Sequence, residues 1–286
     1  MADIATLCPC CGSADLARSP AVLMPFVASR AFGWTPVEIT PDWGLRSLNT
    51  GWAYPLCNSL QCQSCGFLFL DMRFSGAEMG RLYGGYRGEA YALQRDAFEP
   101  GYARTNEAIL ACAYDTTPAE RFLADYVAPA PRVLDWGGDK GDNTPFFKSA
   151  RQVDIYDISE QPVIEGARRV SLSDIAGARY DLVVLSHVLE HVPEPEAVVR
   201  PAAQALEAEG VLYVEVPYEA LVASAPAARD LAPRKKYWHE HVNFFTEDAL
   251  RALLDRCGLQ VLALETRAFD SLANVSQVLS AACRRG

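Results

Sequence analysis

The sequence has 286 residues, of which 50% are hydrophobic and 22% are charged, and its formal net charge is −10. This length allows one large domain, or a domain with an appendage, in an ordinary soluble globular protein. The negative charge disfavours broad binding to nucleic acids or anionic membranes, and no apolar run reaches the roughly 18 residues of a membrane-spanning helix. Because the N-terminus lacks the pattern of a signal peptide, we expect a cytoplasmic protein with reduced thiols.

Residues 1–74 are rich in cysteine and are interpreted as a zinc-binding module. They contain six of the nine cysteines, and two C-x-x-C-G motifs begin at Cys8 and Cys62. Two such motifs can supply four thiolates to one closed, structural zinc site, and the predicted ligands are Cys8, Cys11, Cys62 and Cys65. About 50 residues separate the motifs, which is longer than the usual spacing of a zinc ribbon. Cys10 and Cys57 are alternative ligands. Unliganded cysteines are the simpler alternative.

Residues 75–130 are expected to form a helical linker or lid. Ser75 can cap a helix that begins at Gly76, and residues 107–127 carry apolar side chains at mixed helical spacing. Pro129 and Pro131 then mark a boundary. The chain is therefore predicted to comprise a zinc module at 1–74, this linker at 75–130 and an α/β domain at 131–286.

From residue 131 onward, strand-like and helix-like segments alternate. Apolar runs at 133–136, 153–158, 180–186 and 210–217 are strand candidates, and residues 195–210 are amphipathic. Thr246 is expected to cap a helix that Gly258 ends. The last apolar runs, 259–265 and 274–284, can pair as an antiparallel edge. This alternation predicts an α/β fold with a mostly parallel sheet.

The first two strand candidates enclose a nucleotide-type pattern. Asp135 ends the first strand, and a loop with Gly137, Gly138 and Gly141 follows, before a polar segment that is expected to begin a helix. Glycines let the backbone pass close to a ligand. Asp157 ends the second strand, 22 residues after Asp135, where it can accept hydrogen bonds from ribose hydroxyls. No Lys-Ser or Lys-Thr pair follows the glycines, so a P-loop is excluded.

All four histidines lie in two short segments. His187 and His191 follow the strand candidate at 180–186, and His239 and His241 flank Glu240. The H-x-x-E-H spacing of residues 187–191 also occurs in zinc proteases, but that motif needs a long helix, and prolines follow here at once. Both segments are expected to meet at the carboxyl edge of the sheet, where α/β ligands bind. A histidine oriented by a carboxylate can act as a general base, and a structural hydrogen bond is the simpler alternative for each ring.

In this order, the motifs resemble class I S-adenosylmethionine-dependent methyltransferases. The resemblance rests on VLDWGGDKG, Asp157, YDLVVLSHVLEHVPEP, LYVEVP and HEHVNFFTEDALRALLDRCGL, and it runs from about Arg132 to the C-terminus. The cysteine-rich segment is similar to the N-terminal zinc module of some bacterial methyltransferases of this class. Many of those enzymes act on sugars, nucleotide-sugars or cell-surface glycans.

The resemblance implies a Rossmann-like, seven-stranded sheet whose last strand is antiparallel, with S-adenosylmethionine as the methyl donor. The residues implied along this cofactor are Asp135, Gly137, Gly138 and Gly141 at its methionine part, Asp157 and Ile158 at its ribose, Asp174 near its adenine, and Ser186 and His187 at its methyl-donor end. Asp139 stands where the family usually has glycine. Trp238 stands where related sugar C-methyltransferases usually have tyrosine, so O- or N-methylation is expected more than C-methylation.

The function expected from these features is methyl transfer to a hydroxyl of a sugar, nucleotide-sugar or glycan precursor. The expected base is His239 or His241, oriented by Glu240, with His191 as a second candidate. The cations at residues 234–236 precede two aromatic residues and would suit a phosphate-bearing acceptor, although a solvated loop is the simpler alternative. A non-catalytic, cofactor-binding scaffold in a glycan-assembly complex is the alternative function, and the acidic charge disfavours an RNA methyltransferase.

Overall fold

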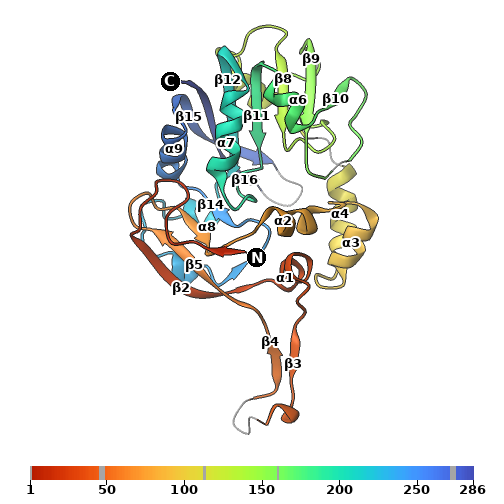
Figure 1. Ribbon diagram of the computed structural model, residues 1–286, viewed down its shortest axis with the longest axis vertical. Helices are drawn as coiled ribbons and strands as arrows, with labels where there is room; N and C mark the ends of the chain where they lie inside the picture. The colour runs from red at the N-terminus through yellow and green to blue at the C-terminus, as the bar shows by residue number, and fades with distance from the viewer. Residues whose placement is uncertain (1, 45–48, 112–113, 160, 271–274) are drawn as a thin grey trace.

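A seven-stranded mixed sheet organises the C-terminal half of the chain (Figure 1). The computed structural model describes residues 2–44, 49–111, 114–159, 161–270 and 275–286. The strands, in their spatial order, are β10 (Ala167–Arg169), β9 (Gln152–Tyr156), β8 (Arg132–Trp136), β11 (Tyr180–Ser186), β12 (Leu206–Pro217), β16 (Val275–Arg285) and β15 (Leu259–Asp270). Strands β8 to β12 are parallel, whereas β16 is antiparallel to both β12 and β15. The expected sheet is therefore confirmed, with its antiparallel strand between two others.

Apolar side chains cover both faces of this sheet, as its central strands require. Strand β11 reads YDLVVLS, and residues 182–185 are all fully buried. Helices α6 (Leu172–Ala176), α7 (Pro195–Gln204) and α9 (Glu247–Arg256) pack in one core cluster, and α5 (Thr117–Leu123) packs in another. Near-continuous apolar runs are typical of parallel strands that are buried on both sides. The expected cap of α9 is confirmed, since the Thr246 side chain accepts a hydrogen bond from the Ala249 amide.

The prediction of a helix after the glycine loop is wrong. Residues 142–150 form turns, although the segment lies directly between β8 and β9. Thr144 precedes Pro145, which disfavours helical backbone at the threonine, and Phe146 has a left-handed φ of 60°. Phe146 and Phe147 still pack on the sheet, in the cluster that contains Leu123 of α5. A packed turn therefore takes the place of the helix on this face.

A second sheet joins the N-terminal module to a distant part of the chain. Its strands, in spatial order, are β13 (Tyr237–Trp238), β2 (Leu16–Leu23), β5 (Leu56–Cys62), β6 (Leu68–Leu70) and β14 (Asn243–Phe244). Both outer strands therefore come from residues 237–244. Trp238 is fully buried, and its Nε1 donates to Ser59 Oγ at 2.9 Å. The His239-Glu240-His241 segment is thus held between two strands that are paired with the N-terminal module.

Helices α1 (Pro25–Phe32), α2 (Gly76–Tyr83), α3 (Glu89–Asp96) and α4 (Tyr102–Ala111) lie beside this second sheet (Figure 1). Ser75 and Glu78 form the reciprocal capping box that starts α2, so the expected helix start is confirmed. The helix expected over residues 107–127 is interrupted, since α4 ends at Ala111 and Pro118 stands in the first turn of α5; residues 112–113 lie outside the described ranges.

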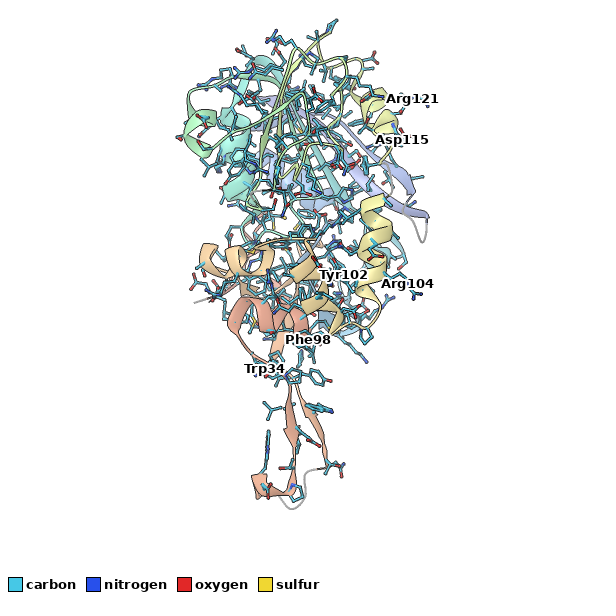
Figure 2. The ribbon with its side chains drawn as sticks, turned by 90° about the vertical axis from the view of Figure 1, so that its right-hand side faces the viewer. Trp34, Phe98, Tyr102, Arg104, Asp115 and Arg121 are labelled. Atoms are coloured by element: carbon cyan, nitrogen blue, oxygen red, sulfur yellow. The ribbon has the colours of Figure 1, made fainter. Side chains whose placement is uncertain are left out.

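A narrow hairpin projects from the N-terminal module. It consists of β3 (Val37–Ile39), the 3-10 turn η1 (Pro41–Trp43) and β4 (Gly51–Ala53), and Figure 2 shows Trp34 at its base. The remaining short elements are β1 (Asp3–Ile4), β7 (Met72–Arg73), α8 (Ala220–Ala223) and η2 (Ala232–Arg234). Within the described ranges, no helix has the length and apolar composition needed to cross a membrane.

Candidate active site

Four cysteine sulfurs of the N-terminal module converge at one point. The Cys8 and Cys65 Sγ atoms are 3.6 Å apart, the Cys11 and Cys62 Sγ atoms are 3.4 Å apart, and all four lie within 4.8 Å of one another. Gly12 and Gly66 each close a tight turn with positive φ, and each amide donates to the carbonyl of the first cysteine of its motif at 2.9 Å. These residues fit a thiolate metal site.

Three glycines of the loop after β8 stand where a side chain would collide with its neighbours. Gly137 has a φ of 87°, and a Cβ there would lie 2.5 Å from Val188 Cγ2. A Cβ on Gly138 would lie 2.5 Å from the carboxyl carbon of Asp135. Gly141 has a φ of 89° and abuts Ile155. The loop backbone is therefore packed against both β8 and the segment that follows β11.

A cavity of about 750 Å³ opens beside this loop. Gly137, Asp157, Ile158, Leu172 and Val188 all contribute to its lining. Ile158 and Leu172 are each 53% exposed, which is unusual for large apolar side chains and gives the cavity apolar walls next to a carboxylate. An apolar slot beside a carboxylate and a glycine-rich loop suits a nucleoside with a ribose. The residues present therefore fit an adenosyl cofactor.

Asp157 and Asp139 form one network at the cavity. Asp157 accepts hydrogen bonds from the Ser159 amide at 2.6 Å and from the Asp139 amide at 3.0 Å. Asp139 has a left-handed φ of 48°, and its carboxylate accepts from Ser159 Oγ at 3.1 Å. Aspartate tolerates this conformation better than most residues. The departure from glycine at position 139 is thus accommodated in the loop.

Two other acids of the expected cofactor set have structural partners. Asp135 is buried and accepts from Thr144 Oγ1 at 2.6 Å, and burial raises its pKa to about 7. Asp174 accepts from Ser171 in the capping box of α6, and it does not line the 750 Å³ cavity. The structure therefore places Asp157 and Ile158 at this cavity and Asp174 outside its lining.

Ser186 and His187 meet a buried carboxylate at the end of β11. Ser186 Oγ donates to Glu215 Oε1 at 3.0 Å, and the His187 ring nitrogens lie 3.3 Å from Glu190 Oε1 and 3.4 Å from Glu215 Oε1. Although burial opposes it, hydrogen bonding to these two carboxylates raises the pKa of His187 to about 10. Both carboxylates therefore favour the protonated form of the His187 ring. Arg267 also pairs with Glu215.

The two histidine segments come into direct contact. The rings of His191 and His241 are 4.7 Å apart at their centroids and nearly perpendicular. His191 Nδ1 lies 2.8 Å from Tyr83 Oη and 3.1 Å from the Glu240 carbonyl oxygen, whereas His241 Nδ1 lies 2.6 Å from Glu219 Oε1. Burial lowers the pKa of His191 to about 4. Burial also acts to lower the pKa of His241, but the hydrogen bond to Glu219 raises it above the ordinary value.

Asn243 fastens the loop that carries His191. Its Nδ2 donates to the carbonyl oxygens of Leu189 at 2.7 Å and Val192 at 2.6 Å, and its backbone amide donates to the Glu190 carbonyl at 3.1 Å. Its Oδ1 accepts from Arg73 of the N-terminal module at 3.1 Å. Because Asn243 is fully buried, these bonds hold the two histidine segments in a fixed relation.

His239 and Glu240 belong to a separate group of side chains. Glu240 accepts from Tyr91 Oη at 2.5 Å and from Arg95 Nη1 at 2.6 Å, and His239 Nε2 pairs with Glu99. Glu240 therefore does not orient His241, whose carboxylate partner is Glu219. Arg95, Glu219, His239, Glu240 and His241 all contribute to the wall of a second cavity of about 280 Å³.

The sequence analysis missed the carboxylates that orient these rings. Glu219 lies two residues after the end of β12, near the position of a strand-end acid, and this was the available signal. Glu99 contacts His239, which is 140 positions further along the chain, and Tyr83 contacts His191, which is 108 positions further along. Both come from the helical segment 75–130, where no local pattern marks them as partners. Their contribution depends on how α2 and α3 pack against the loop after β13.

Comparison with known proteins agrees with the geometry. A family model described as a methyltransferase domain matches residues 108–264, more than half of the chain. Over 130 residues the chain is 27% identical to a ubiquinone biosynthesis O-methyltransferase of Idiomarina loihiensis, covering 44% of this chain and 50% of that protein, so it spans about half the length of this curated relative.

Similar solved structures are also methyltransferases. The 1,6-didemethyltoxoflavin-N1-methyltransferase of Burkholderia thailandensis, with bound 1,6-didemethyltoxoflavin and S-adenosylhomocysteine, has a TM-score of 0.48 and 19% identity, over 69% of this chain and 90% of that chain. A glycopeptide N-methyltransferase complexed with sinefungin has a TM-score of 0.44 and 15% identity, over 62% of this chain and 96% of that chain. From the family match and the strand order together, the chain belongs to the methyltransferase-domain family, and the domain it carries is a class I S-adenosylmethionine-dependent methyltransferase.

Proposed function

We propose that the protein methylates a hydroxyl group of a sugar, nucleotide-sugar or cell-surface glycan precursor. The observation that carries this proposal is the hydrogen bond of 2.6 Å between His241 Nδ1 and Glu219, beside the half-buried ring of His191. A hydroxyl must lose its proton when it is methylated, and an imidazole that is oriented by a carboxylate can accept that proton.

The cofactor would be held by the residues that line the larger cavity. The backbone of Gly137 and Gly138 would lie along its amino-acid part, Asp157 would accept hydrogen bonds from its ribose hydroxyls, and Ile158 and Leu172 would face its adenine. When bound, S-adenosylmethionine supplies an activated methyl group. Val188 lines the same cavity and is three residues from His191, so the histidine pair lies close to this site.

In this proposal, His241 takes the acceptor proton on Nε2. Donation from Nδ1 to Glu219 fixes the ring and its tautomer, and the carboxylate stabilises the imidazolium that forms. His191, which burial keeps neutral, and Tyr83 would position the acceptor oxygen. Glu240, tied to Tyr91 and Arg95, would hold the loop in place rather than orient the base. Approximation of the hydroxyl to the methyl group would supply much of the rate enhancement.

The four-cysteine cluster is proposed to hold one structural zinc ion. Tetrahedral thiolate sites of this kind stabilise small loop-rich modules, and this module supplies the sheet that holds residues 237–244. Zinc would therefore affect catalysis only through the position of the histidine segment.

A mass-spectrometric screen of sugars, nucleotide-sugars and glycan precursors for the gain of one methylene would test the proposed function. With the acceptor found, His241→Gln is expected to lower turnover by about 10²–10⁴-fold while S-adenosylhomocysteine binds as in wild type. His239→Gln serves as the matched control and should have a smaller effect on turnover. Full turnover by His241→Gln would refute the assignment of the base. Normal cofactor binding without transfer to any acceptor would instead favour the scaffold function.

A further inference from the structure

The smaller cavity contains a lysine that the proposed function does not use. Lys235 lines the 280 Å³ space together with His241, Glu219 and Phe244. It lies in the cationic segment 234–236. Its side chain is half-buried, whereas the side chains of Arg234 and Lys236 are exposed. We infer that Lys235 binds an anionic group, a phosphate or a carboxylate, on the same small acceptor whose hydroxyl faces His241. This inference rests on the proposed function.

The other charged side chains around this cavity already have partners. Arg95 bonds to Glu240 at 2.6 Å and to Glu99 at 2.9 Å, and Glu219 pairs with His241 at 2.6 Å. Among the residues that the structure describes, the Lys235 ammonium has neither a hydrogen bond nor an ion pair with a carboxylate. Lys235 is therefore the cation of this cavity wall that makes no hydrogen bond or ion pair among the described residues, although the charge of Glu219 acts on it through space.

Three aromatic rings fix the position of that charge. Lys235 Nζ lies 4.7 Å, 4.8 Å and 4.5 Å from the ring centroids of Tyr237, Trp238 and Phe244. Trp238 is immobilised by its burial and by the hydrogen bond to Ser59, and Phe244 belongs to β14. Contacts with ring faces stabilise an ammonium but leave its N–H donors without oxygen acceptors. Partial burial lowers the pKa of Lys235, which agrees with an ammonium that has lost part of its hydration.

The size of the cavity limits the acceptor. At about 280 Å³ it is slightly smaller than the range of cavities that enclose drug-sized ligands. It therefore has room for one sugar-sized unit, and the anionic group must lie within that unit's reach of the hydroxyl near His241. A sugar phosphate and a uronic acid both satisfy this requirement, whereas a neutral sugar leaves the ammonium unpaired.

Calorimetry in the presence of S-adenosylhomocysteine tests this inference without requiring methyl transfer. The probes are glucose 1-phosphate, glucuronate and methyl glucoside, which share a ring and differ in the anionic group. Wild type should bind at least one of the anionic probes more tightly than methyl glucoside. Lys235→Met should weaken that binding about ten- to hundredfold, the expected loss of a hydrogen bond to a charged group, and Lys235→Arg should largely restore it. Lys236→Met is the matched control, because it removes an exposed charge from the same loop, and it should change the affinity little.

The alternative outcomes have separate meanings. Equal binding of the neutral and anionic probes, unchanged binding by Lys235→Met, equal losses in both methionine variants, or no saturable binding of either anion at millimolar concentration would each overturn the inference. A phosphate-only response identifies a phosphorylated acceptor, and a response to glucuronate alone identifies a carboxylated one. Anion binding through Lys235 by a protein that methylates nothing would keep the inference and overturn the proposed function. Turnover that depends on His241 but not on Lys235 would keep the proposed function and overturn the inference.

Discussion

The contact between Gly137 and Val188 allows a quantitative test of how the cofactor loop is built. Gly137→Ala would place a Cβ 2.5 Å from Val188 Cγ2 and would force an L-residue into a φ of 87°. The left-handed backbone should cost about 1–2 kcal/mol. Crowding of the valine should cost about 1–3 kcal/mol more, as in other overpacked sites. The free energy of unfolding should therefore fall by about 2–5 kcal/mol.

A double-mutant cycle separates these two costs. Val188→Ala removes the methyl groups that the new Cβ would meet, so Gly137→Ala should be less destabilising by about 1–3 kcal/mol in the Val188→Ala background. The strain from positive φ should persist in both backgrounds. Urea denaturation measures each free energy, and S-adenosylhomocysteine titration measures the accompanying change in cofactor affinity. If Gly137→Ala costs the same with and without Val188, or costs nothing at all, the argument from loop geometry is wrong.

The remaining predictions concern the metal, the ribose contact and pH. Replacing Cys62 and Cys65 by serine should remove one zinc per chain and destabilise the N-terminal module, and elemental analysis showing unchanged zinc would contradict this. Asp157→Ala should weaken S-adenosylhomocysteine binding about ten- to hundredfold in calorimetry, whereas wild-type affinity would exclude the ribose contact. Because burial raises the pKa of Asp135 to about 7, the folded state holds this proton more tightly than the unfolded state, and stability should fall as pH rises from about 4 to 7. Asp135→Asn should flatten that dependence in denaturation measured across this range, and an unchanged slope would refute the explanation.

Features that depend on neighbouring residues could be predicted from the sequence. Ser75 and Thr246 cap helices because their hydroxyls reach amides three residues away, and such contacts need no tertiary information. The parallel strands were visible as apolar runs because both faces of the sheet are covered. The helix after the glycine loop was predicted incorrectly, because the backbone at Thr144 and Phe146 responds to Pro145 and to the packing of two phenylalanines on the sheet.

Contacts between segments that are far apart in the sequence could not be predicted. The pattern around His239 and His241 indicated a functional segment, but it suggested Glu240 as the orienting carboxylate because that residue is adjacent in sequence. In the structure Glu240 faces Arg95 of α3, and His241 turns to Glu219. The chain bends at Glu240 between β13 and β14, so Glu240 lies 3.6 Å from His239 Nδ1 while its other sequence neighbour, His241, is paired with Glu219.

The placement of β13 and β14 has a consequence for synthesis on the ribosome. Their partners β2 and β6 are complete by residue 70, whereas residues 237–244 emerge about 10–30 s later at ordinary translation rates. During that interval both edges of the nascent sheet are open, and open edges are templates for aggregation. All four clustered cysteines have been made by then, so metal binding can stabilise the three-stranded intermediate before its outer strands exist. Metal depletion should therefore lower the yield of soluble nascent chains more strongly than it lowers the activity of molecules that have already folded.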